Sequence, residues 1–507
     1  MSRSPERGAR ERLLDLLAGT LGAALPLAFA PWELSPLAPV LLAGLFALWL
    51  ASEGAGLAAW RGWLFGLGLF GVGTSWVRES FTFSDVPPAA ALALTLAFVA
   101  FMALYPAALG YLQARLGRGL SWRWRALALL PAAWVLVEWV RGWLFTGFPW
   151  LQVGYSQVGA PLGGLAPVLG VYGVGWAVAL SAGLLLALAR GGVPVPARVA
   201  AGAALAALWG LGWGLGHVEW TRPSGPARSV AVVQGNVAQD LKWRDEQRAA
   251  SMAHHLALTR AHWDADLVVW PETAVPAFAH RVQGFLAELS DEARAHGAGV
   301  LLGVPFRDVE SGRYFNSVMA LGSELGVYHK RHLVPFGEYV PFSPVLGRVL
   351  DLLNAPMSDF SAGPPGQPPL AVDGLRVGVS VCYEDAFGEE VIDALPAADL
   401  LVNLSNDAWF GDTVAPHQHQ QKARMRAIET GRDLVRATNT GISAMIDWRG
   451  AVTGRAPQFQ SVVLRGSVTP RSGTTPYAAL GNAPVVFGAG LTLLAVGVLG
   501  AFRSRRV

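Results

Sequence analysis

The fold of the more polar part of this chain is decided by residues 375–384, LRVGVSVCYE. The apolar, valine-rich run at 375–381 predicts a buried strand that ends where polar residues begin. This places Cys382 at the carboxyl end of the strand, in front of an expected helix. A helix start beside a thiol would favour the thiolate, which is the reactive form of cysteine. Cys382 is also the only cysteine in the 507 residues, so a disulfide within the chain is excluded.

Similar strands are expected on both sides of this segment. The apolar runs are 229–234, 267–270, 299–304, 317–321, 400–404 and 442–447, and polar helical patterns occupy 244–262, 282–296 and 418–430. Buried strands separated by helices predict an α/β layered domain. Because α/β sheets gather ligands at the carboxyl ends of their strands, the polar residues that follow these strands are candidates for a functional site.

Three such residues form a chemically coherent set. Glu272 follows the strand at 267–270, Lys330 follows a short polar connection, and Cys382 ends its strand. A nucleophile needs a base, and a tetrahedral oxyanion needs positive charge. Taken one at a time, these residues could be a surface carboxylate, a surface lysine and a buried thiol. Taken together, they predict acyl transfer through the cysteine.

The whole chain has the composition of a membrane protein. Hydrophobic residues make up 52% of the sequence and charged residues only 15%, against about 25% charged in globular domains. The net charge of +3 gives no support for nucleic-acid binding. Stretches of about 20 apolar residues can cross a bilayer. Eight spans are expected, at 13–30, 37–51, 60–77, 88–112, 127–145, 162–188, 199–215 and 484–502.

Arginine placement predicts the orientation of these spans, because Lys and Arg concentrate in cytoplasmic loops. The inner segments, each with arginine, would be 1–12, the turn near Arg61, 117–125, 190–198 and 503–506. The outer loops 80–87 and 147–159 have none. We therefore expect a bundle of about seven spans at 1–221, with an uncleaved first span. A catalytic domain at 222–477 on the outer face and a final span with a basic cytoplasmic tail at 478–507 would follow.

Some other motifs have simpler explanations. The glycines at 66–71 match G-x-G-x-x-G formally, but they lie in an apolar span with no preceding strand, so helix packing explains them better. The pairs at 254–255 and at 417 and 419 have no further Cys or His to complete a metal site, and no metal is expected. Glu138 and Arg141 in the fifth span could be functional or a structural pair.

The ordered set Glu272, Lys330 and Cys382 resembles the Glu-Lys-Cys triad of the nitrilase, or carbon–nitrogen hydrolase, superfamily. That resemblance implies an αββα sandwich. A narrower resemblance, to the apolipoprotein N-acyltransferase family, also covers the flanking seven-plus-one spans. Its motifs are Lys330 with 332–338, then 405–411, 424–427 and 436–442.

The narrower resemblance implies the reaction and its partners. A phospholipid would load Cys382 with an acyl chain, and the thioester would acylate the α-amine of a diacylglyceryl-cysteine lipoprotein. Membrane lipids would be partners, no cofactor would be needed, and the site would face the periplasm from the bacterial inner membrane. Supporting roles are implied for Trp243, Asn316, Glu338, Tyr383 and Glu384. The alternatives are a membrane-tethered nitrilase or amidase that uses water, and a transporter with an outer binding domain.

Overall fold

The computed structural model describes residues 5–83, 86–242, 244–341 and 359–504. The chain divides into two compact units. The helical unit comprises Met1–Arg78, Pro88–Val218 and Leu480–Val507. The α/β unit comprises Glu79–Pro87 and Glu219–Ala479.

The helical unit contains the apolar helices that the composition predicts. Its principal helices in the described residues are α1 (Pro5–Ala24), α2 (Leu37–Leu50), α3 (Ala55–Gly73), α4 (Pro88–Met102), α5 (Leu104–Leu116), α7 (Leu130–Arg141), α8 (Ala166–Ala189), α9 (Val195–Leu215) and α17 (Ala483–Ser504). In the same residues, five helical segments are long and apolar enough to cross a bilayer. The count of eight stays a prediction, since α2 and α7 have 14 and 12 residues.

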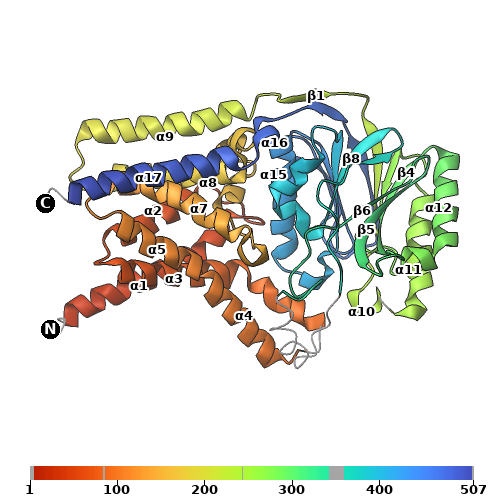
Figure 1. Cartoon of the computed structure of the whole chain (residues 1–507), viewed down its shortest axis with the longest axis horizontal. Coiled ribbons are helices and arrows are strands. Elements are labelled where there is room, and N and C mark those ends of the chain that lie inside the picture. Colours follow the sequence, from red (N-terminus) through yellow and green to blue (C-terminus); the bar gives the residue numbers. More distant parts are fainter. Residues whose placement is uncertain (1–4, 84–85, 243, 342–358, 505–507) are drawn as a thin grey trace. The chain divides into compact units, whose positions relative to one another are not determined.

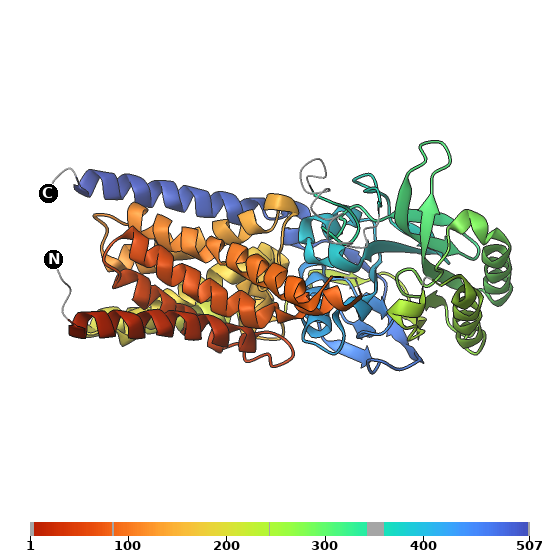
Figure 2. The ribbon, with the colours of Figure 1, turned by 90° about the horizontal axis from the view of Figure 1, so that it is seen from below.

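Glycines allow the helices of this unit to pack closely. Helix α3 lies against both α1 and α5, and Figure 2 shows the corresponding red and orange helices side by side. A β-carbon at Gly68 would overlap the backbone of Gly19 and Ala23 in α1. One at Gly66 would overlap Ala103, at the start of α5. The glycine pattern therefore serves helix packing, and the formal nucleotide-binding motif lies inside a helix.

This packing gives a first testable prediction. Gly68→Ala should lower the free energy of unfolding by about 1–3 kcal/mol, because the added methyl group has no space against α1. Gly56→Ala is the matched control, since it lies in the same helix and a β-carbon there meets nothing within 4 Å. Thermal unfolding of both variants in detergent would check this. Equal midpoints would contradict the close packing of α1 and α3.

Within the described residues, the α/β unit has two six-stranded sheets. The first has the order β13 (Val462–Val468), β2 (Arg228–Gln234), β3 (Leu267–Val269), β4 (Gly299–Arg307), β5 (Tyr314–Leu321), β6 (Gly326–His329). The second has the order β12 (Val452–Arg455), β11 (Ala444–Ile446), β10 (Leu434–Thr438), β9 (Leu400–Ser405), β8 (Leu375–Val381), β7 (Leu370–Val372). Strands β2, β3 and β4 run parallel, as do β8, β9 and β10.

Side chains that alternate along the strands face two different cores, one between the sheets and one under the helices. In β2, Val230 and Val232 enter a core that also contains Val402 and Leu404 of β9, so the two sheets pack face to face. Ala231 and Val233 point the other way, toward a core shared with α11 (Asp245–Arg260) and α12 (Gln283–His296). The second sheet is covered on its outer face by α15 (Ala415–Thr430). Figure 1 shows these helices on opposite sides of the strands. The expected α/β sandwich is confirmed.

Candidate active site

The carboxyl ends of strands carry the three residues of the expected triad. Glu272 lies in the turn after β3, Lys330 directly follows β6, and Cys382 directly follows β8. Lys330 Nζ is 3.6 Å from Glu272 Oε1. Cys382 lies close enough to both for their charges to act on its thiol. The side chains of Lys330 and Glu272 are 1% and 9% exposed, so the cation and the carboxylate face each other away from bulk water.

Glu338 and Asn316 complete the surroundings of the lysine. Lys330 Nζ is 2.8 Å from Glu338 Oε2. The amide of Asn316, on β5, donates to Glu272 Oε1 at 2.7 Å and to Glu338 Oε1 at 2.9 Å. The backbone N–H of Val334 donates to Glu338 Oε2 at 2.8 Å. Each polar group is thus held by another, and the arrangement is stiff.

The neighbouring carboxylates decide the charge of Lys330. Burial lowers the pKa of Lys330, but Glu338 and Glu272 outweigh it, and the net shift is upward. The amine therefore stays protonated at any physiological pH. A permanent ammonium suits the stabilisation of a developing oxyanion, whereas it would serve poorly as a base at neutral pH.

The thiol differs from the sequence-based expectation. Burial and the charge of Glu272 raise the pKa of Cys382, against the opposing effect of Lys330. The predicted helix start is a 3-10 segment, Cys382–Ala386, so there is no long helix dipole to favour the thiolate. The expectation of a depressed thiol pKa was wrong, and any reaction at this sulfur would need a base to take its proton. Cys382 also has φ +51°, a left-handed conformation that costs a non-glycine residue about 1–3 kcal/mol.

Glu384 and Tyr383 hold the segments that carry Lys330 and Cys382. Glu384 is buried and accepts backbone hydrogen bonds from Val381 at 2.6 Å and from Arg331 at 2.7 Å. It therefore joins the end of β8 to the residue that follows Lys330. The ring of Tyr383 packs edge-on against His332, with centroids 5.7 Å apart. These two predicted site residues contact the loops that present the triad.

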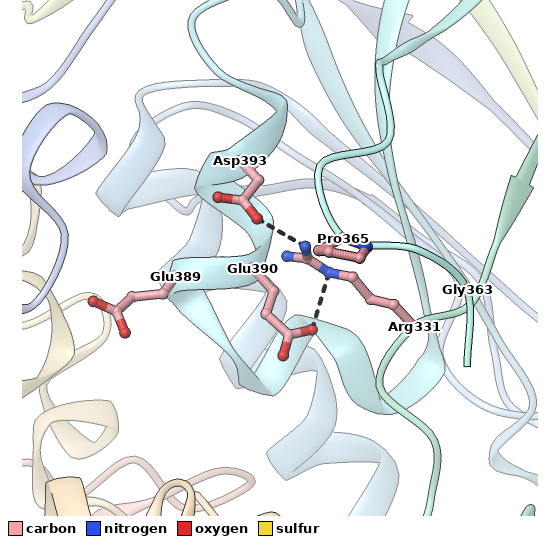
Figure 3. A pocket seen from close by; sticks show the side chains of 6 residues that line it. All are labelled: Arg331, Gly363, Pro365, Glu389, Glu390 and Asp393. Carbon is pink, nitrogen blue, oxygen red and sulfur yellow. Dashed lines mark hydrogen bonds and ion pairs between the residues drawn. The ribbon is translucent and has the colours of Figure 1, made fainter. Parts of the chain in front are cut away.

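Beside this loop lies a surface pocket of about 460 Å³. Figure 3 shows Arg331 in this pocket, paired with Glu390 and with Asp393. The two ion-pair distances are 3.3 Å and 2.7 Å. The other residues that line the pocket are Gly363, Pro365 and Glu389. The guanidinium is thus already engaged by carboxylates, which makes the pocket a poor anion site. Its ion pairs instead anchor the residue next to Lys330.

Several groups near the triad were not predicted as site residues. Lys242 is buried, and its Nζ donates to the backbone carbonyl of Glu272 at 3.0 Å. Burial lowers its pKa to about 8, although Glu272 raises it. Behind Cys382 lies a buried polar cluster that contains Asp407 and Arg436. Asp407 and Arg436 lie in the motifs 405–411 and 436–442, for which no chemical role was predicted from the sequence. Trp243 lies outside the described residues.

Comparison with known proteins is consistent over nearly the whole chain. The family model "Apolipoprotein N-acyltransferase N-terminal domain" matches residues 21–184, and the model "Carbon-nitrogen hydrolase" matches residues 229–476. The apolipoprotein N-acyltransferase of Methylococcus capsulatus is 49% identical over 97% of this chain and 96% of its own. That of Nitrosomonas europaea is 43% identical over 97% and 98%. A carbon–nitrogen hydrolase structure from Helicobacter pylori is 16% identical, covers 48% of this chain and 88% of its own, and has a TM-score of 0.37.

Proposed function

The chain belongs to the apolipoprotein N-acyltransferase family, and from this membership we propose how its residues carry out the N-acylation of apolipoproteins in lipoprotein maturation. Cys382 is the nucleophile, Glu272 the general base and Lys330 the oxyanion-stabilising cation. The acyl donor is a phospholipid, and the acceptor is the α-amine of a diacylated lipoprotein. The reaction is ping-pong, with a thioester on Cys382 between its halves.

The observation that carries this proposal is the buried Lys330, 3.6 Å from Glu272 and 2.8 Å from Glu338, beside a cysteine with a raised pKa. A thiol that is neutral at rest needs a base at the moment of attack, and Glu272 is the carboxylate whose charge acts most strongly on it. Glu338 pairs with Lys330, and Asn316 hydrogen-bonds both Glu272 and Glu338, so these two residues hold the lysine and the base in place.

In the loading step, the Cys382 sulfur attacks the ester carbonyl carbon of a phospholipid while Glu272 accepts the thiol proton. The carbonyl oxygen becomes an oxyanion that Lys330 stabilises. The carbon–oxygen ester bond then breaks. Glu272 returns the proton to the leaving oxygen, so a lysophospholipid departs and an acyl thioester remains on Cys382.

In the transfer step, the α-amine of the lipoprotein attacks the thioester carbonyl. Glu272 accepts a proton from the nitrogen, and Lys330 stabilises the second oxyanion. The carbon–sulfur bond breaks, an amide forms, and the sulfur regains its proton as Cys382 is released. A thioester suits this step because it is activated toward amines. Confinement of both lipid substrates in one membrane also raises the rate at which they meet the enzyme.

We infer a location in the bacterial inner membrane, with the α/β unit on the periplasmic face. The five apolar segments support a membrane protein, and the arginine asymmetry of the loops supports this orientation. The start of α1 and the end of α17 lie at the same end of the helical unit in both views, which suits an even number of crossings. An outer site would meet lipoproteins after export.

Loading can be tested by intact mass. Incubation with phospholipid should add one acyl mass to the protein, removable by hydroxylamine, because a thioester is cleaved by that amine. Cys382 is the only cysteine in the sequence, so an adduct that hydroxylamine removes from a thiol must lie on this residue. Cys382→Ala is the control and should carry no adduct. Active enzyme whose mass never changes would rule out the covalent route.

A further inference from the structure

Behind Cys382, a buried histidine contacts the backbone of the nucleophile itself. His419, on α15, is 2% exposed. Its Nε2 lies 3.1 Å from the carbonyl oxygen of Cys382 and 3.1 Å from Asp385 Oδ1. Its Nδ1 lies 2.9 Å from Asp407 Oδ1. The amide of Asn403 donates to the same Cys382 carbonyl at 3.3 Å.

The partners of His419 fix its protonation. A carbonyl and carboxylates accept hydrogen bonds and cannot donate them, so both ring nitrogens must donate. A neutral imidazole has one N–H, and the ring is therefore an imidazolium. Burial and Arg436 lower the pKa of His419, but Asp385 and Asp407 outweigh them, and the net shift is upward.

The cluster around His419 balances its charges. Arg436 Nη1 lies 3.2 Å from Asp385 Oδ2, and its Nη2 lies 3.0 Å from Asp407 Oδ2. Two carboxylates thus face one guanidinium and one imidazolium, with all four groups buried. The buried Lys422 also lies near both carboxylates, but burial lowers its pKa well below the ordinary value. Arg436 also donates to Asn403 Oδ1 at 2.6 Å, which orients that amide toward the Cys382 carbonyl. His419 and Asn403, which donate to the Cys382 carbonyl, are thus themselves held by charge-assisted hydrogen bonds.

This anchoring coincides with backbone strain at Cys382. A cysteine with φ +51° stays in that conformation when its surroundings hold it there. The carbonyl carbon of Cys382 is bonded directly to the Cα that carries the thiol, so the hydrogen bond from His419 to this carbonyl restricts the backbone of Cys382 itself. We propose that His419, held by Asp385 and Asp407, is a positioning residue that keeps the Cys382 thiol aimed for acyl loading. The inference rests on the proposed role of Cys382 as nucleophile.

Two substitutions of His419 distinguish a role in positioning the thiol from a role in the stability of the fold. In His419→Gln, the side-chain NH₂ can reach the place of Nε2 and donate to the Cys382 carbonyl. In His419→Asn, the shorter side chain reaches only the place of Nδ1. Both remove the imidazolium charge and both bury an amide. His417→Gln is the control, because His417 lies on the same helix, is only partly buried and hydrogen-bonds Arg455.

The readout is the rate of acyl loading of Cys382 at saturating phospholipid, with thermal midpoints measured beside it. His419→Asn should load about 100-fold more slowly than the unmodified protein, as expected for a misplaced nucleophile. His419→Gln should stay within about fivefold, and the lipid concentration for half-maximal loading should not change in either. Equal rates for the Gln and Asn variants would overturn the positioning role. If the Asn variant does not fold, a Gln variant slowed about 100-fold overturns it too.

The unmodified protein distinguishes the failure of this inference from that of the proposed function. If it forms no acyl adduct at all, the nucleophile assignment fails. If it loads normally and His419→Asn also loads normally, only the positioning role fails. Alkylation of Cys382 by iodoacetamide gives a second readout that needs no lipid. It should also slow in His419→Asn more than in His419→Gln, and equal alkylation rates would contradict the proposal.

Discussion

Lys330→Met should slow acyl loading of Cys382 on the order of 100- to 1,000-fold, because it removes the charge that we propose stabilises the oxyanion. The methionine side chain has nearly the volume of lysine, so the site keeps its packing. The raised pKa of Lys330 means that the lost group is a full positive charge at every pH used in an assay. The measurement is the time course of acyl-enzyme formation by intact mass.

A second variant guards this prediction against a trivial loss of folding. Lys330→Met alone leaves Glu338 buried without its cation, which can cost about 3–5 kcal/mol. The double variant Lys330→Met, Glu338→Gln removes one charge of each sign. It should recover much of the thermal midpoint and still load slowly. Fast loading in the folded double variant would show that Lys330 serves the fold and not the reaction.

Glu272→Gln should slow loading on the order of 1,000-fold, because an amide cannot accept the thiol proton. Its oxygen can still accept the hydrogen bond from Asn316, so the local geometry is kept. Glu310→Gln, at an exposed loop position, is the control and should load at the normal rate.

The same substitution should have the opposite effect on alkylation. The Glu272 carboxylate is one of the causes that raise the pKa of Cys382. Without that negative charge the thiol pKa falls, and a larger fraction is thiolate at pH 8. Iodoacetamide should therefore modify Cys382 faster in Glu272→Gln than in the unmodified protein. Loading and alkylation that fall together in a folded variant would contradict the predicted fall in the thiol pKa.

The strands before Glu272 and Cys382 could be predicted because each is a mainly apolar run. Strand β6, before Lys330, was not predicted, because its four residues form no apolar run. The run at 375–381 coincides with β8, and Cys382 follows it as expected. Strand β10 was missed, because Arg436 interrupts its apolar residues and resembles a surface charge in the sequence. In the fold, Asp385 and Asp407 neutralise that arginine, so it is buried. Such pairing joins residues distant in sequence, and no local pattern reveals it.

Helix α15 shows the same limit on a larger scale. Its polar sequence is typical of a solvent-exposed helix, yet His419, Lys422, Arg426 and Glu429 are all buried. Position 419 was considered only as a metal ligand, whereas the structure surrounds it with carboxylates and a backbone carbonyl. The thiol pKa was also misjudged, because sequence indicates the helix start but not the burial of the sulfur or the charge of Glu272.

The thioester itself offers the most direct test of the proposed transfer. Both a transferase and a hydrolase would form it, and they differ in what discharges it. The acyl-enzyme should be isolated in detergent and its mass followed after addition of a diacylated lipopeptide with a free α-amine. An N-acetylated lipopeptide serves as the matched control. The account predicts a persistent thioester that is discharged quickly by the free amine, with a triacylated product, and not by the acetylated peptide. Equally fast discharge in water alone, with free fatty acid as the product, would contradict it.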